Sequence, residues 1–183
     1  MSTHIDSCTR SLMPSSLAAD ITLMWWMRQT TGAGGFVLAT SAVSPVGTYS
    51  GHNFSTSGSN LFVTTGKDGA ATPSQRRSWN LPGLPNTLDD TWRHVAITFT
   101  NGGEDPANTY LNGVLTTVPV YVSGSATTIA FNSGSDFRAN VNWEFDDTTP
   151  TTSGSAWGEF ADFRAYSSVL TAARILAIAN GEA

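Results

Sequence analysis

Alternation of apolar and polar side chains within residues 91–115 constrains the fold of this chain more than any other feature. Over residues 93–99 the odd positions are mostly apolar and the even positions are small or polar, which is typical of a strand with one face in a core. The chain then turns, returns, and reaches Asn112-Gly113, the dipeptide that type I′ hairpin turns favour. These features predict three consecutive antiparallel strands, the last of which covers residues 114–122.

The rest of the chain reads as strands followed by one helix, so we expect two stacked antiparallel sheets. Residues 20–28 are apolar at odd and even positions alike, as in a central strand covered on both faces. Thr171 can cap a short helix over residues 172–179, and Gly181 can stop it. Residues 70–90 contain three prolines and are expected to be the least regular part. Further strands are expected at residues 36–43, 45–58 (a short one), 61–65, 127–132, 137–145 and 157–166.

The size and charge of the chain exclude several classes of protein. With 183 residues, we expect one domain over residues 20–183, preceded by an arm of residues 1–19 that could hold an edge strand. A net charge of −5 with only 9 Lys and Arg argues against nucleic acid as a partner. No apolar run reaches membrane-spanning length, so we expect no membrane insertion. The first residues show no secretion signal, and Cys8, the single cysteine, cannot form an internal disulfide.

Three segments, taken in order, resemble the laminin G-like members of the concanavalin A-like lectin/glucanase jelly rolls. The first is the early strand ITLMWWM, and the second is the pair of central hairpins with Trp92-x-His94-Val95-Ala96 and Tyr-Leu-Asn-Gly. The third is the closing strand GEFADFRAY with the helix that follows it. The resemblance covers residues 20–181 and departs from the family at the shortened first strand and in the Ser/Gly-rich middle. It implies an all-β, two-sheet antiparallel jelly-roll sandwich with one short C-terminal helix.

A catalytic motif known from relatives of this jelly roll is incomplete here. Relatives that cleave β-glucans carry Glu-x-Asp-x-x-Glu, whose first two carboxylates share one strand face. Glu144 and Asp146 fit the first two positions, but Thr149 stands at the third. Glu159 and Asp162 are an odd number of residues apart, so alternation places them on opposite faces of a strand. We therefore expect no catalytic residues and no enzymatic activity.

Calcium is the one metal that the resemblance brings into question, because many members of the family bind it at a sheet rim. Hard cations prefer carboxylate and carbonyl oxygens, and the candidate ligands are Asp146 and Asp147 in a polar loop, with Asp136 nearby in sequence. None of them has the spacing of a dedicated calcium loop, and a solvated acidic turn explains them as well. No cofactor is required by the sequence, and Ca²⁺ stays open.

Trp79 is the tryptophan that the sequence singles out for binding, because it lies in the proline-rich stretch beside two adjacent arginines. An aromatic ring with guanidinium groups and an amide would suit a sugar ring or a protein neighbour. The candidate ligand-binding residues are therefore Trp79, Arg76, Arg77 and Asn80. The competing interpretation is that the Trp79 ring packs back over the sheet.

The resemblance also implies structural roles for other residues. Phe160 is expected to face the core, and Asp162 and Arg164 to form a cross-strand polar pair. For His94 we expect a hydrogen-bonded packing role rather than a ligand role. The tryptophans expected in the core are Trp25, Trp26, Trp92, Trp143 and Trp157.

These features favour a non-catalytic recognition or adhesion module, displayed on a larger assembly, whose partner is a glycan or a protein. The alternative is a structural virion protein, such as a capsid decoration or tail subunit, that acts through protein–protein contacts. A glycan hydrolase or lyase ranks third because of Thr149. The sequence leaves the localisation open, and a homo-oligomer is compatible with it.

Overall fold

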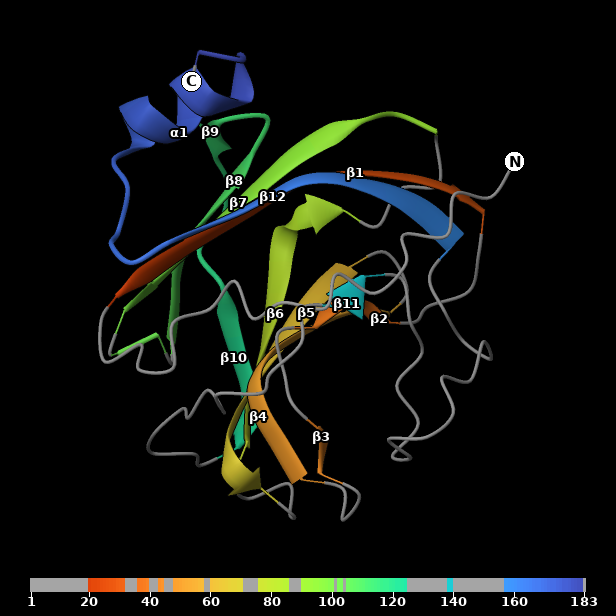
Figure 1. Ribbon diagram of the computed structural model, residues 1–183, viewed down its shortest axis with the longest axis vertical. Helices are drawn as coiled ribbons and strands as arrows, with labels where there is room; N and C mark the ends of the chain where they lie inside the picture. Colours follow the sequence, from red (N-terminus) through yellow and green to blue (C-terminus); the bar gives the residue numbers. More distant parts are fainter. Residues whose placement is uncertain are drawn as a thin grey trace.

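The computed structural model places the chain in two antiparallel sheets stacked face to face, with one short helix (Figure 1). The structure describes residues 20–31, 36–39, 43–44, 48–57, 60–70, 76–85, 90–100, 102–103, 105–124, 138–139 and 157–182. The five-stranded sheet has the order β12-β1-β7-β8-β9 and comprises β1 (Ile21–Thr31), β7 (Arg93–Thr100), β8 (Asp105–Leu111), β9 (Val114–Leu115) and β12 (Trp157–Tyr166). This architecture confirms the all-β jelly-roll expectation.

The seven-stranded sheet has the order β10-β6-β5-β4-β2-β11, with β3 paired to β4 at its side. Its strands are β2 (Phe36–Ala39), β3 (Val43–Ser44), β4 (Thr48–Ser57), β5 (Asn60–Ala70), β6 (Arg76–Pro85), β10 (Val120–Gly124) and β11 (Arg138–Ala139). The long strands β4, β5 and β6 form its middle, and all pairings in both sheets are antiparallel.

The core lies between the two sheets and is built by the alternation seen in the sequence. On β1, the odd-numbered residues from Ile21 to Met27 face inward, while Met24 on the opposite face is buried under the helix. The Trp25 ring lies 5.0 Å from the Phe54 ring, so the two sheets meet through aromatic side chains. Trp25 and Phe99 are both fully buried, as expected. The side chain of Phe160 lies outside those that the structure describes.

The proline-rich stretch is more regular than the sequence indicated. Residues 76–85 form β6, so the expectation of an irregular segment is wrong there. Prolines normally interrupt a ladder, but Pro82 and Pro85 come after the continuous register that ends with the pair of Leu61 and Leu81. The two prolines therefore leave the ladder between β5 and the first part of β6 intact.

The predicted strand over residues 114–122 is divided between the two sheets. β9 pairs with β8 at one end of the five-stranded sheet, and β10 pairs with β6 at one end of the seven-stranded sheet. The segment between them crosses from one sheet to the other and includes Pro119, which has no N–H to offer a ladder. The single long strand of the sequence interpretation is therefore wrong.

The C-terminal helix α1 (Ala172–Ala179) covers part of the outer face of the five-stranded sheet (Figure 1). The Thr171 side chain accepts a hydrogen bond from the Arg174 N–H at 3.3 Å, and Gly181 ends the helix with φ of 81°, so both predicted caps are confirmed. Ile175 and Ile178 pack into a cluster whose members from the sheet are Met24, Ala96 and Tyr110. Leu176, on the same helix, is 41% exposed.

The turn between β8 and β9 packs against α1. Asn112 and Gly113 have φ of 51° and 77°, the left-handed values that a type I′ turn requires. The Asn112 side-chain oxygen accepts a hydrogen bond from the His94 N–H at 2.9 Å, and the Asn112 N–H donates to the His94 carbonyl at 2.8 Å. The predicted hairpin is confirmed, and its tip lies under the helix.

Replacing Gly113 by alanine is expected to destabilise the protein by about 2–4 kcal/mol. A Cβ atom at this position would lie 2.8 Å from the Leu176 Cα, a backbone atom that can move only with the helix, and the φ of 77° adds strain. Chemical denaturation of the variant measures the loss. Gly102→Ala is the matched control, because Gly102 has φ of 68° but nothing within 4 Å of its added Cβ. Equal losses for the two variants would mean that the contact with the helix contributes nothing.

Several sequence expectations fall on residues outside the described part of the chain. They include the N-terminal arm of residues 1–19, the strand at residues 127–132, and the motif residues Glu144, Asp146 and Thr149. The single-domain organisation therefore stays a prediction. The helical part of the described chain contains nothing long and apolar enough to cross a membrane.

Candidate functional site

Of the four binding residues that the sequence singled out on β6, the three whose side chains the structure describes do not converge on one surface. Trp79 is 6% exposed and belongs to the core between the sheets, where its ring meets Tyr121 edge-on at 6.0 Å. Arg77 reaches across to the other sheet and forms an ion pair of 2.8 Å with Asp105 on β8. Asn80 alternates to the opposite face of β6 and is half-buried.

The structure thus supports the competing interpretation for the Trp79 ring, which packs on the sheet. The side chain of Arg76 lies outside those that the structure describes. A ligand-binding role for Trp79, Arg76, Arg77 and Asn80 stays a prediction. The calcium candidates Asp136, Asp146 and Asp147 also lie outside the described residues, and the described part of the chain holds no group of three metal-ligating side chains.

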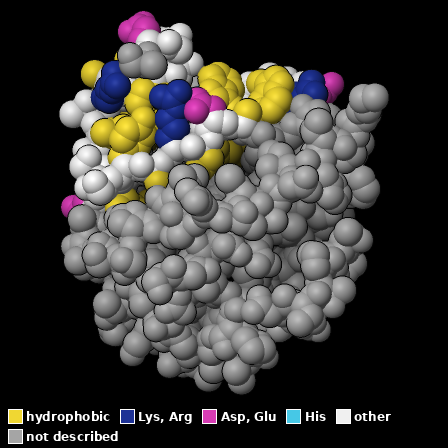
Figure 2. Space-filling view, in the orientation of Figure 1, with side chains coloured by type: hydrophobic (Ala, Val, Ile, Leu, Met, Phe, Trp, Pro, Cys, Tyr) yellow, Lys and Arg dark blue, Asp and Glu magenta, His cyan; other side chains and the backbone are white. Residues whose placement is uncertain are grey.

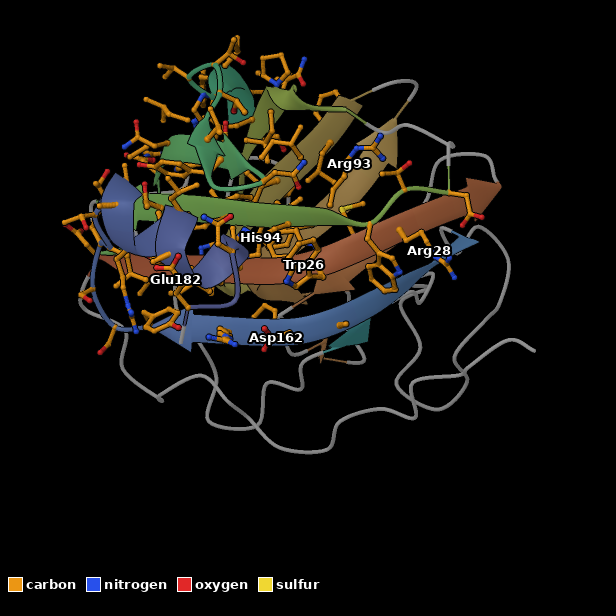
Figure 3. The ribbon with its side chains drawn as sticks, turned by 90° about the horizontal axis from the view of Figure 1, so that it is seen from above. Trp26, Arg28, Arg93, His94, Asp162 and Glu182 are labelled. Atoms are coloured by element: carbon orange, nitrogen blue, oxygen red, sulfur yellow. The ribbon has the colours of Figure 1, made fainter. Side chains whose placement is uncertain are left out.

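A different set of polar and aromatic side chains gathers on the outer face of the five-stranded sheet, beside α1 (Figure 3). Even-numbered residues of β1 and β7 point to this face, and β12 adds a charged pair at its side. Hydrophobic side chains lie next to basic and acidic ones along the upper part of the face shown in Figure 2. We call this set the outer-face cluster; it consists of Trp26, Arg28, Asp90, Trp92, His94, Asp162 and Arg164.

An indole ring and a guanidinium group form the more exposed end of the outer-face cluster. Trp92 is 38% exposed, and the Arg28 guanidinium carbon lies 5.4 Å from its ring centroid, within cation–π range. The same guanidinium forms an ion pair of 3.2 Å with Asp90, which precedes β7. Arg28 is therefore held in place between a ring and a carboxylate, while much of Trp92 remains open to solvent.

His94 forms the buried floor of the outer-face cluster. Its side chain is 1% exposed, and its ring meets Trp26 edge-on, with ring centroids 5.4 Å apart. Nδ1 of His94 has no hydrogen-bond partner in the described part of the chain. Burial lowers the pKa of His94, while Asp162 opposes this shift and Arg164 adds to it, so the ring is neutral at pH 7. The ring packs as the sequence predicted, but the expected hydrogen bond is not found at Nδ1 in the described part of the chain. The preference for packing over a ligand role stays a prediction.

Asp162 and Arg164 form the charged side of the outer-face cluster. Their side chains make a bidentate ion pair, with Arg164 Nε 2.9 Å from Asp162 Oδ1 and Nη2 2.8 Å from Oδ2. The pair lies within one strand, not across two strands as expected. This hydrogen-bonded carboxylate, with Tyr166, raises the pKa of Arg164 above its usual value. Both side chains are partly exposed, so the pair contributes little to stability and more to the shape of the surface.

A bulge in β12 places this pair on the outer face of the sheet. The register with β1 shifts between Met24 and Trp26, and Asp162 has φ of 48°. The extra residue reverses the alternation, so Phe163 packs against the core while Arg164 lies opposite Met24. Strict alternation could not have predicted this exchange of faces.

The chemistry of the outer-face cluster suits recognition. A flat aromatic ring can stack on an apolar ligand face, while guanidinium and carboxylate groups supply hydrogen bonds in fixed directions. Both carboxylates of the cluster, Asp90 and Asp162, are ion-paired with arginine side chains, which hold them in fixed positions. Sequence reasoning missed this surface because it assigned Trp26 and Trp92 to the core. Arg28, which shares a strand face with Trp26, was the residue that could have indicated a solvent-facing surface.

Comparison with known families gives the same fold. The model of the laminin G type within the concanavalin A-like lectin/glucanases superfamily matches residues 5–176. The chain belongs to this superfamily. No sequence among the curated proteins matches it.

Several solved structures share this jelly-roll fold at low sequence identity. A structure reported for the ganglioside-dependent cell entry of botulinum neurotoxin type C has a TM-score of 0.60 and 16% identity, covering 92% of this chain and 37% of that one. The binding domain of botulinum neurotoxin DC in complex with SialylT has a TM-score of 0.59 and 16% identity, covering 91% and 37%. The SAP-like pentraxin of Limulus polyphemus has a TM-score of 0.58 and 15% identity, covering 88% and 70%. The chain thus spans just over a third of the length of the toxin binding domains, and these likenesses show the fold alone.

Proposed function

We propose that this chain is a non-catalytic recognition module that binds a glycan on the outer face of the five-stranded sheet. The observation that carries the proposal is Trp92, an indole ring 38% exposed beside a guanidinium group that is held in place by Asp90. The apolar face of a sugar ring can stack on such a ring, and the adjacent charged groups can bind its hydroxyls. Membership of a lectin-containing superfamily supports this class of ligand, as does the structural likeness to a neurotoxin whose cell entry depends on gangliosides.

Replacing Trp92 by alanine is expected to weaken glycan binding at least about tenfold, or ~1.4 kcal/mol, because the stacking surface is lost. The wild-type chain is first applied to a glycan array, and the glycan with the highest signal is then titrated by calorimetry. Trp92→Phe keeps an aromatic ring and should retain most of the affinity. Val169→Ala is the matched control, because Val169 is 42% exposed and lies outside the outer-face cluster. Equal affinity of Trp92→Ala and the wild type would refute this location.

The same glycan array tests whether ligand binding requires calcium. If Asp136, Asp146 and Asp147 hold a calcium ion that supports ligand binding, the array signal should disappear with EDTA and return with added Ca²⁺. A signal that persists in EDTA would leave the outer-face cluster as a metal-independent site. An array run on Asp146→Asn would then be indistinguishable from the wild type.

A second candidate function is a structural subunit that acts through protein–protein contacts, such as a capsid decoration or tail protein. One observation favours protein contacts: six large apolar side chains are exposed within residues 114–122. Co-purification with particles, together with an array that gives no signal, would support this alternative over glycan recognition.

A further inference from the structure

An apolar strip follows the segment that crosses from β9 to β10, away from the outer-face cluster, with side chains on both faces of β10. Among the described residues, it contains six of the nine large hydrophobic side chains that are exposed. The strip covers residues 114–122, and its six members are Val114 (63% exposed), Leu115 (56%), Val118 (68%), Val120 (54%), Tyr121 (53%) and Val122 (54%). Isolated surface hydrophobics are ordinary, but a contiguous strip of this kind marks an interaction surface.

The apolar strip lies where both sheets end. In the described part of the chain, β9 is the last strand of the five-stranded sheet and β10 is the last strand of the seven-stranded sheet. Sheet edges are commonly protected by charged side chains. Residues 113–124 contain no charged residue at all, although Pro119 and a register irregularity after Tyr121 limit how far a ladder could extend. The side chains of the strip, more than its backbone, are therefore the means of contact.

We propose that the apolar strip is the interface through which two copies of this chain form a two-fold dimer. Charge is compatible with a second copy as the occupant: each copy carries a net charge of −5, and the uncharged strip lets two copies meet without bringing like charges together. A two-fold axis presents the same patch on both sides, and apolar antiparallel edges are complementary to themselves.

The size of the apolar strip fits this assignment. Summed over both faces of the segment, the exposed fractions of its six residues correspond to roughly 650 Å² per copy, against ~800 Å² per partner in a standard interface. The backbone and the neighbouring threonines of the crossing segment supply the remainder. β12 forms the opposite edge of the five-stranded sheet from β9, so dimerisation leaves the outer-face cluster of both copies open. Two ligand surfaces on one particle would raise the avidity for a multivalent ligand.

The oligomeric state of the purified chain tests the proposal directly. Sedimentation equilibrium is run from about 1 to 100 µM, a range that covers weak and tight dimers. It is expected to show a species of about 39 kDa, twice the 19.4 kDa of the chain. Val120→Glu should weaken the dimer at least about tenfold, because two like charges are brought into an apolar contact. Its circular dichroism and melting temperature should match the wild type, since Val120 is 54% exposed. Val169→Glu, at an exposed valine outside the strip, should leave dimerisation unchanged.

A charge-pair experiment keeps the proposal testable if Val120→Glu disturbs the fold. An equimolar mixture of Val120→Glu and Val120→Lys should associate more strongly than either variant alone, because opposite charges then face one another across the two-fold axis. A monomer throughout the concentration range, or a dimer that Val120→Glu does not weaken, would overturn the proposal and leave the strip to a different protein. Trp92→Ala should remain dimeric, so failure of the glycan proposal and failure of this one are distinguishable.

Discussion

Replacing Trp79 by alanine is expected to lower the free energy of unfolding by about 3–5 kcal/mol. The indole is 6% exposed, belongs to the main core cluster and contacts the Tyr121 ring, so truncation removes buried area and leaves a cavity between the sheets. Urea denaturation followed by tryptophan fluorescence and circular dichroism measures the loss. Because ordinary domains are stable by only about 5–15 kcal/mol, such a change removes a large share of the stability.

The comparison with Trp92→Ala decides between a core role and a ligand role for Trp79. Trp92 is the same residue type at a 38% exposed position, and its truncation should cost no more than about 1 kcal/mol of stability. Trp79→Phe should recover much of what Trp79→Ala loses, because an aromatic side chain still fills most of the space. If Trp79→Ala instead kept wild-type stability and lost glycan binding, the ligand-binding role predicted from the sequence would be correct and the core assignment wrong.

Lowering the pH from 7 to 4 is expected to remove about 3 kcal/mol of stability through His52 alone. Burial lowers the pKa of His52 from 6.5 to about 4, against a smaller opposing effect of its hydrogen bond to the Gly103 carbonyl. Between these two pKa values the unfolded chain binds a proton at this position and the folded chain does not. The stabilisation is therefore complete above pH 6.5 and is lost as the pH falls toward 4. Burial of His94 shifts its pKa in the same direction and adds to the loss.

Denaturant unfolding at pH 7, 6, 5 and 4.5 measures this dependence, and His52→Gln isolates the share of His52. The amide of glutamine can still donate to the Gly103 carbonyl but does not titrate, so the variant should show a flatter stability profile between pH 6.5 and 4. His94→Gln is the matched control at the second buried histidine. Identical profiles for the wild type and His52→Gln would show that protons bind elsewhere on unfolding.

Local patterns in the sequence were sufficient for most of the fold. Period-two alternation predicted β7, the Asn112-Gly113 dipeptide predicted the hairpin of β8 and β9, and Thr171 predicted the start of α1, because each depends on neighbouring residues alone. The division of residues 114–122 between two sheets could not be predicted in the same way. A strand that changes sheet keeps its composition, and only the positions of β8 and β6 decide where each half pairs.

The candidate site was harder to predict, since it depends on exposure rather than on residue type. Trp79 and Trp92 look alike in sequence, each near a strand and beside polar residues, but only the packing of β6 against β10 and the core shows that the Trp79 ring is enclosed. The pairing of β1 with β7 brings Trp26 opposite His94 and Arg28 close to Trp92. The spacing of these residues along the chain does not predict either contact. The bulge at Asp162 also changes which side chains of β12 face the core, and strict alternation does not predict this change.

The single additional residue of the β12 bulge shifts the alternation of all the side chains that follow it in the strand. Every position after it has the opposite orientation from strict alternation, so a homologue of equal length without the bulge at Asp162 would turn its counterpart of Phe163 toward solvent and its counterpart of Arg164 toward the core. Alignments of this superfamily that place no gap here would therefore compare side chains from opposite surfaces of the molecule.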